Sequence, residues 1–146
     1  MAFFNIFNIA GSGMSAESVR LNTVASNLAN ADSVSSNAAT AYKARYPVFQ
    51  AVQASLMSAG AGTDPTTQAD AAVQVRDIVQ STAAGTARYE PGNPLADGNG
   101  YVYSSNVNVV EQMADMISAS RSYQNDAQVL ETSKSLMLDT LKLAQG

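Results

Sequence analysis

The 146-residue sequence contains no cysteine and no histidine. This absence excludes thiol catalysis, a disulfide framework, and zinc sites built from thiolates or imidazoles. It also removes the side chain that most often exchanges protons near neutral pH. We therefore expect no catalytic residue, no metal site and no cofactor, and the protein is predicted not to be an enzyme.

Charge is also scarce. Charged residues make up 14% of the chain, against about a quarter in an average domain, and the net charge is -4. The few basic residues are scattered, whereas phosphate binding needs clustered Lys and Arg. We expect no nucleic-acid partner. Low charge together with many Asn, Gln, Ser and Thr residues is typical of surfaces that become covered.

Long apolar runs are missing as well. No stretch approaches the ~18 uninterrupted apolar residues of a membrane span, so direct membrane insertion is not expected. The first residues, "MAFFNIFNIAGSGMSA", are interrupted by Asn5 and Asn8, and the first basic residue is Arg20. This pattern does not fit a cleaved signal peptide.

Aromatic residues are few, and much of the apolar content is alanine. The central core is expected to be small for this length.

The first and last parts of the chain show helical spacing. Residues 5–31 give two heptad rows, although Gly11 and Gly13 weaken the first turns and place the firm start of the helix near Ser12 or Met14. The rows are Phe7, Met14, Leu21 and Leu28, and beside them Ala10, Glu17, Val24 and Ala31.

Residues 107–144 repeat this spacing over more than five heptads. Such a helix spans roughly 50 Å at 1.5 Å per residue, so its own domain cannot cover most of it. One row is Val109, Met116, Tyr123, Leu130, Met137 and Ala144, and the second is Met113, Ser120, Ala127, Lys134 and Leu141.

The middle of the chain, residues 32–106, has strand and turn patterns. Strands are expected at 46–52, 71–79, "ARYE" and "YVYS", the last two joined by the turn-rich "PGNPLADGNG". Residues 57–70 are expected to form a flexible loop. The predicted fold is α+β, with long terminal helices packed as a coiled-coil-like pair and a β-rich middle, in segments 1–31, 32–106 and 107–146.

The helical rows alone leave two interpretations open, a helix pair inside one chain or packing against other chains. Many apolar residues lie off the rows and need further neighbours. The stretch "NTVASNLANADSV", Asn22 to Val34, has small residues that permit close approach and amides that hydrogen-bond without the cost of burying a charge. This composition favours a helix surrounded by other helices.

No motif carries recognisable chemistry. The spacing brings no two of the loop and strand carboxylates together, so solvent exposure is expected for Asp64, Asp70, Asp77, Glu90 and Asp97. "DGNG" is a turn without the ligands of a calcium loop. Arg121 is expected to face solvent rather than a carboxylate of a neighbouring chain.

Three blocks resemble the axial proteins of the bacterial flagellum. "FNIFNIAGSGMSAESVRLNTVASNLANADSV" is similar to their amino-terminal segment, with the shared Ala-Ser-Asn-Leu-Ala-Asn core at Ala25 to Asn30, and "NVNVVEQMADMISASRSYQNDAQVL" is similar to its carboxy-terminal partner. "YEPGNPLADGNGYV" resembles the corresponding segment of the proximal-rod members. Hook and distal-rod members generally have a Thr-x-Gly-Tyr element after the shared Asn, and its absence after Asn30 also favours the proximal rod. Ser105 stands where those members are expected to have Pro, and Asn106 or Asn108 can cap the next helix.

The resemblance implies a structural subunit of the flagellar proximal rod, polymerising into a helical tube that is both drive shaft and export channel. It implies export by the flagellar type III apparatus without signal cleavage, assembly in the periplasm, and contacts with other copies, other rod proteins, and the MS-ring/export-gate adaptor at the rod base. The residues expected at the assembly interface are Leu21, Val24, Asn27, Leu28, Asn30, Met113, Met116, Tyr123, Leu130 and Met137.

Two other functions remain possible at this stage. One is a secreted binding protein built on a self-contained helical hairpin. The other, less favoured, is a peptidoglycan hydrolase tied to the rod, which would need two converging carboxylates in a cleft.

Overall fold

The computed structural model describes residues 2–53 and 71–145, and the flexible loop predicted at 57–70 lies outside the described residues. The described chain is α+β, as predicted, with a long helix at each end and short antiparallel strands between them. In chain order the elements are α1 (Ala2–Ala29), β1 (Val34–Ser35), β2 (Arg45–Gln53), β3 (Ala71–Gln80), β4 (Ala87–Tyr89), β5 (Tyr101–Ser104) and α2 (Val109–Gln145).

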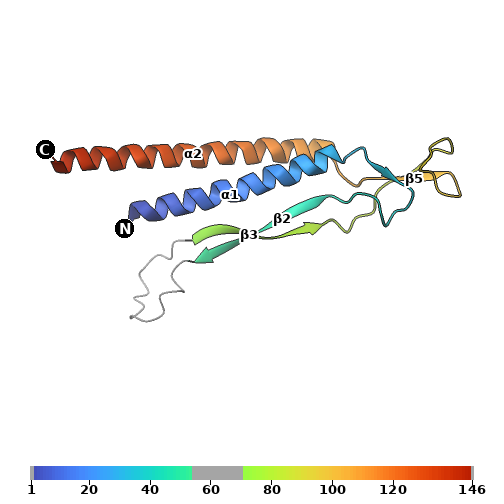
Figure 1. The fold of residues 1–146 in the computed structure, drawn as a ribbon, viewed down its shortest axis with the longest axis horizontal. Helices are drawn as coiled ribbons and strands as arrows, with labels where there is room; N and C mark the ends of the chain where they lie inside the picture. Colours follow the sequence, from blue (N-terminus) through green and yellow to red (C-terminus); the bar gives the residue numbers. More distant parts are fainter. Residues whose placement is uncertain (1, 54–70, 146) are drawn as a thin grey trace.

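The molecule is elongated, with α1 and α2 running antiparallel along its length (Figure 1). Both chain ends lie at one end of the helix pair, and β5 with its connecting loops lies at the other (Figure 1). The hairpin of β2 and β3 runs along α1, which packs against both α2 and the hairpin. Within the described residues, neither helix has a stretch long and apolar enough to span a membrane.

Helix α1 begins at Ala2, so the prediction of a firm start near Ser12 or Met14 was wrong. Gly13 lies at a close approach between the helices, where a Cβ atom would stand 2.6 Å from Oδ2 of Asp126. Tertiary packing therefore offsets the low helix propensity of glycine at this position. The buried residues of α1 are mostly small or polar and allow two neighbours to approach closely: Ala10, Ala16, Thr23, Val24 and Asn27.

The second heptad row predicted for α2, which begins at Met113, lies one position away from the row that is buried. The buried positions are Gln112, Ala119 and Ser133, which share one helix face, whereas Met113 is exposed. Two of these three residues are polar, and apolar periodicity cannot identify them. Helix α2 packs against α1 through a narrow seam of small and amide side chains, and much of its apolar surface stays outside the seam.

The predicted pair of "ARYE" and "YVYS" is confirmed as β4 and β5. The strands expected at 46–52 and 71–79 are present as β2 and β3. β2 and β3 pair antiparallel from Arg45 opposite Gln80 to Gln53 opposite Ala71, with an irregularity between Val48 and Phe49. β5 lies between β1 and β4 in a separate small sheet. The backbone N–H of Val73 donates to Oγ of Ser12, which ties β3 directly to α1.

Helix α2 starts with an amide cap. Oδ1 of Asn108 accepts hydrogen bonds from the N–H groups of Val110 and Glu111, at 3.1 and 3.3 Å. Of the two caps that the sequence allowed, the structure uses Asn108. Ser105 donates its own N–H to the carbonyl of Ser33, a bond that proline could not make.

Candidate assembly interface

Asn27 is a buried amide that hydrogen-bonds to several segments of the chain. Its side chain is 0% exposed, and its Nδ2 donates at 2.8 Å both to the carbonyl of Arg45 and to Oε1 of Gln112. Its Oδ1 accepts from the N–H of Arg45 and the hydroxyl of Tyr42, at 2.9 and 3.0 Å. One amide therefore joins α1, β2 and α2. It is not available to an adjoining subunit in this structure, so the expected role of Asn27 as an intersubunit contact does not fit.

A second amide fixes the connections at the same end of the helix pair. Oδ1 of Asn106 accepts from the N–H of Ala44 at 2.7 Å, and its Nδ2 donates to the carbonyl of Ala83 at 2.8 Å. The sequence indicated Asn106 only as a helix cap and did not indicate a role for Gln112. The one available signal for Gln112 was an amide in the first turn of a predicted helix.

The helices also share an ionic contact. Arg20 on α1 donates to Asp115 on α2 at 2.8 Å and lies 3.7 Å from Glu17 of its own helix. These side chains are only partly buried, so solvent screens the interaction and its main effect is on the register of the pair. Arg20 opposite Asp115 and Asn27 opposite Gln112 fix the same antiparallel alignment.

The carboxylates considered for catalysis are engaged in local structure where the chain is described. Asp97 closes its own loop, because its Oδ1 accepts from the N–H groups of Asn99 and Tyr101. Hydrogen bonds from Tyr101, Asn99, Tyr103 and Gly100 to Asp97, that from Tyr101 first, lower the pKa of its carboxyl. The negative charge of Asp97 in turn raises the pKa of Tyr103.

Glu90 and Asp77 are also engaged in local contacts. Hydrogen bonding from Asn93, and next the neighbouring Arg88, lowers the pKa of Glu90. Oδ1 of Asp77 accepts the N–H of Ile78. Asp64 and Asp70 lie outside the described residues. No group of three acidic side chains able to hold a metal occurs in the described part of the chain.

The structure places the expected interface residues in three classes. Val24 is buried together with Asn27. Met113 and Tyr123 are exposed, by 51% and 37%. The others are half-buried and could contribute part of their surface to a neighbour: Leu21, Leu28, Asn30, Met116, Leu130 and Met137.

Large apolar side chains remain exposed along α2. Val110 is 76% exposed and Ile117 is 56% exposed, and together with Met113 they form a row at helical spacing near the start of the helix. The far end of α2 carries a further group of exposed residues: Leu136, Leu138, Leu141 and Leu143. A row of exposed apolar side chains, as at Val110, Met113 and Ile117, is typical of a protein contact surface.

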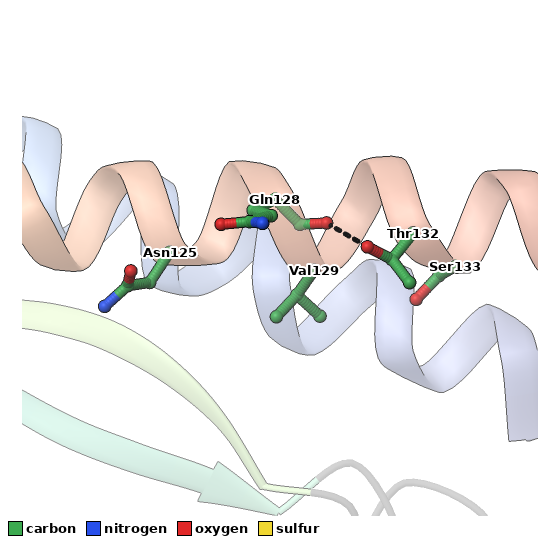
Figure 2. A pocket seen from close by; sticks show the side chains of 5 residues that line it. All are labelled: Asn125, Gln128, Val129, Thr132 and Ser133. Carbon is green, nitrogen blue, oxygen red and sulfur yellow. Dashed lines mark hydrogen bonds between the residues drawn. The ribbon is translucent and has the colours of Figure 1, made fainter.

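A shallow pocket of about 450 Å³ lies on the same helix, lined by Asn125, Gln128, Val129, Thr132 and Ser133. Figure 2 shows these side chains along successive turns of α2, with the hydroxyl of Thr132 donating to the carbonyl of Gln128 at 2.9 Å. The lining residues are neutral, so the pocket offers hydrogen-bonding groups but no acid, base or nucleophile pair of an active site.

Two family models match the chain at its two ends. Residues 7–39 match the "Flagella basal body rod protein" model, and residues 99–143 match the "Flagellar basal body rod FlgEFG protein C-terminal" model. The matched segments contain most of α1 and of α2. They are the elements that form the helix pair, and α2 carries the exposed row of Val110, Met113 and Ile117.

Relatives match over the whole length. The chain is 50% identical over 145 residues to the flagellar basal-body rod protein FlgC of Salmonella typhimurium, covering 99% of this chain and 100% of the relative. The same identity and coverage hold for FlgC of Escherichia coli O157:H7, and FlgC of Yersinia enterocolitica is 48% identical over the same length. The chain therefore belongs to the FlgC family of flagellar basal-body rod proteins and is a structural subunit of the rod.

Proposed function

We propose that this subunit builds the rod by packing the apolar surfaces of its terminal helices against neighbouring subunits, and that it has no enzymatic activity. The observation that carries the proposal is the row of exposed apolar residues on α2, Val110, Met113 and Ile117. The pairing of α1 with α2 leaves this row uncovered. Burial of apolar surface at about 25 cal/mol per Å² is the main driving force for such association.

The proposed assembly is the proximal rod, a helical tube around the export channel that transmits rotation. Contacts that join two different faces of a subunit, and do not close into a ring, extend into a helical array. The elongated helix pair, with both chain ends at one end, suits a subunit whose helices line a tube while the β segments lie at a different radius (Figure 1). The proposed contact residues are Leu21 and Leu28 on α1, Asn30 directly after it, and Met113, Met116, Tyr123, Leu130 and Met137 on α2.

The proposed partners are other copies of the chain, the other proximal and distal rod proteins, and the MS-ring/export-gate adaptor at the rod base. The resemblance of "YEPGNPLADGNGYV" to proximal-rod members supports this position. We further propose export through the flagellar type III apparatus without signal cleavage and assembly in the periplasm. The segments 1–31, 32–106 and 107–146 are proposed as the units of this organisation.

The lack of enzymatic activity rests on the state of the carboxylates. Glu90 pairs with Arg88, Asp97 holds its own loop, and Asp77 accepts the N–H of Ile78. Glu17 and Asp126, which the sequence did not connect, line one pocket, but Glu17 is already in an ion pair with Arg20. The hydrolase alternative predicts release of soluble fragments from purified peptidoglycan. The rod-subunit proposal predicts none.

The substitution Ile117→Asp tests the assembly proposal. Ile117 is 56% exposed, so the variant should fold as a monomer with an unchanged thermal midpoint. It should be absent from purified basal bodies, and cells that carry it should be non-motile, because a buried unpaired carboxylate opposes the contact. Ser118→Asp adds the same charge at the next exposed position and should reduce incorporation and motility less than Ile117→Asp does.

Normal rods and full motility with Ile117→Asp would contradict the proposal. A secreted binding protein with a self-contained hairpin would also pair α1 with α2, so folding of the monomer does not separate the two functions. Their predictions differ in location. The binding-protein alternative predicts a chain that is absent from purified basal bodies and that motility does not require.

A further inference from the structure

A pocket of about 470 Å³ opens where α1, α2 and the β2–β3 hairpin meet. Ile9, Phe49 and Val73 contribute apolar walls, while Glu17 and Asp126 contribute carboxylates. α1 lies between α2 and the hairpin, so the pocket lies on the hairpin side of the helix pair (Figure 1).

The charge of this pocket is only partly balanced within the described chain. Oε2 of Glu17 is buried and accepts no hydrogen bond from a described residue, and its ion pair with Arg20 is long at 3.7 Å. Arg20 lies closer to Asp115, at 2.8 Å. Asp126 has no ion pair among the described residues, although Gly13 brings α1 close to its carboxylate.

These features define the chemistry of an occupant. A cation on a long aliphatic stem would place its charge between Glu17 and Asp126 and its methylene groups against the apolar walls. An arginine suits the pocket best, since its guanidinium can donate hydrogen bonds to two carboxylates at once.

The chain itself presents such a group on another surface. Arg121 is exposed and forms no ion pair with a described residue. Helical spacing places it in line with Val110 and Ile117, on the side of α2 opposite Gln112 and Ala119. It is therefore a cation at the end of an exposed apolar row, complementary to an acidic pocket with apolar walls.

The geometry points to a head-to-tail contact between two copies of this chain, in which Arg121 of one copy enters the pocket between Glu17 and Asp126 of the next. Ile117 of the first copy then packs near Phe49 of the second. This inference rests on the proposed function and specifies one contact within it. The two surfaces lie on different sides of the molecule, so the contact can repeat without closing.

Disulfide cross-linking tests this arrangement directly, since the natural chain has no cysteine. Ile117→Cys and Phe49→Cys are introduced into separate copies, the two variants are produced together, and basal bodies are isolated and mildly oxidised. A covalent dimer is expected when both variants are present and not when either is present alone. The pair Lys134→Cys with Phe49→Cys, from another exposed position of α2, should give none.

A double-mutant cycle tests the charge pairing. Arg121→Gln and Asp126→Asn remove the charges with little change of shape, and each is expected to lower incorporation about tenfold, a loss of about 1.4 kcal/mol. If the groups meet, the double variant loses no more than the larger single loss. If they are independent, the losses multiply to about a hundredfold. Lys134→Gln combined with Asp126→Asn should behave as an independent pair.

The outcomes separate this inference from the proposed function. Rods that contain both cysteine variants but give no product joining positions 117 and 49 would overturn the head-to-tail contact and leave the proposed function standing. A product joining two copies of the Ile117→Cys variant, or a product of a mass that indicates a different rod protein in the pocket, would do the same. Absence of the wild-type chain from purified rods would overturn the proposed function itself.

Discussion

At the scale of single residues, the fold depends on amides placed where different segments meet. Asn27 bonds to Gln112, to the main chain of Arg45 and to Tyr42, and both atoms of its amide are engaged. A carboxylate at this site would lose the two donated bonds, and an aliphatic residue would lose all four. The amide is the group that can both donate and accept at one buried position.

Asn27→Ala is expected to destabilise the monomer by about 3 kcal/mol, because it leaves the amide of Gln112 and the N–H and carbonyl of Arg45 without partners in a buried site. Denaturant unfolding monitored by circular dichroism measures this loss. Asn30→Ala is the matched control within the same motif. Among the described residues its Nδ2 donates to the carbonyl of Ser26 in the last turn of α1, and a loss of under about 1 kcal/mol is expected. Equal losses for the two variants would contradict the role given to Asn27.

Asp97 should make the 90–101 loop sensitive to acid. Hydrogen bonds that favour its charged form lower the pKa of its carboxyl below the ordinary 3.8. Their contribution to loop stability is therefore fully present above pH 3.8 and is lost as the pH falls through the lower folded-state pKa. Amide hydrogen exchange at Asn99 and Tyr101 should accelerate below that range, beyond the intrinsic change with pH. Asp97→Asn should lose this acid dependence, and an unchanged profile would exclude Asp97 as its source.

The sequence indicated which residues make polar contacts better than it indicated the partners in those contacts. The abundance of Asn and Ser around Ala25 to Asn30 correctly indicated polar contacts between packed segments. It could not indicate that the partners of Asn27 are β2 and α2 of the same chain, since hydrogen-bonding capacity carries no information about which acceptor is near. The same limit hid the role of Gln112, whose partner Asn27 lies far away in the sequence.

At the scale of elements, α2 is longer than the helix it packs against. Asn27 lies opposite Gln112, and Gly13 lies opposite Asp126. Continued at this register, Ala2 falls near position 137. The remaining residues of α2 extend beyond α1, as Figure 1 shows, and they carry exposed Leu138, Leu141 and Leu143. An apolar extension without a partner among the described residues fits the proposed contact with neighbouring subunits.

Removal of residues 138–146 is predicted to change the unfolding free energy of the monomer by no more than about 0.5 kcal/mol, because Leu138, Leu141 and Leu143 are exposed. The same truncation should abolish incorporation into rods. Asp139→Ala, which breaks only an exposed ion pair with Lys142, is the control and should incorporate normally. Rods formed from the truncated chain would show that the extension is not an assembly surface.

Element positions followed from local patterns, and the packing of the helices did not. The strand pairs and the turn at Asp97 to Gly100 were predictable because alternation and turn dipeptides are local signals. The faces of α1 and α2 were predicted less well. Apolar spacing does not distinguish residues that are covered within the chain from residues that stay exposed, and α2 carries both kinds.

At the scale of the whole molecule, the interactions inside the subunit involve different residues from the proposed contacts between subunits. Small residues, buried amides and the contact between Arg20 and Asp115 hold the subunit together. Exposed apolar residues along α2 are proposed to form the contacts of the assembly. A subunit arranged in this way can fold with only a small core and still gain a large contact area in the rod.

Thiol labelling at a single introduced cysteine tests this division most directly, because the natural chain has none. With Ile117→Cys, the account predicts rapid labelling of the monomer and at least tenfold slower labelling in purified rods, equivalent to about 1.4 kcal/mol of protection. Ala119→Cys, in the buried seam, should label slowly in both states. Equal labelling of the Ile117→Cys variant in the monomer and in the rod would contradict the claim that neighbouring subunits cover the exposed face of α2.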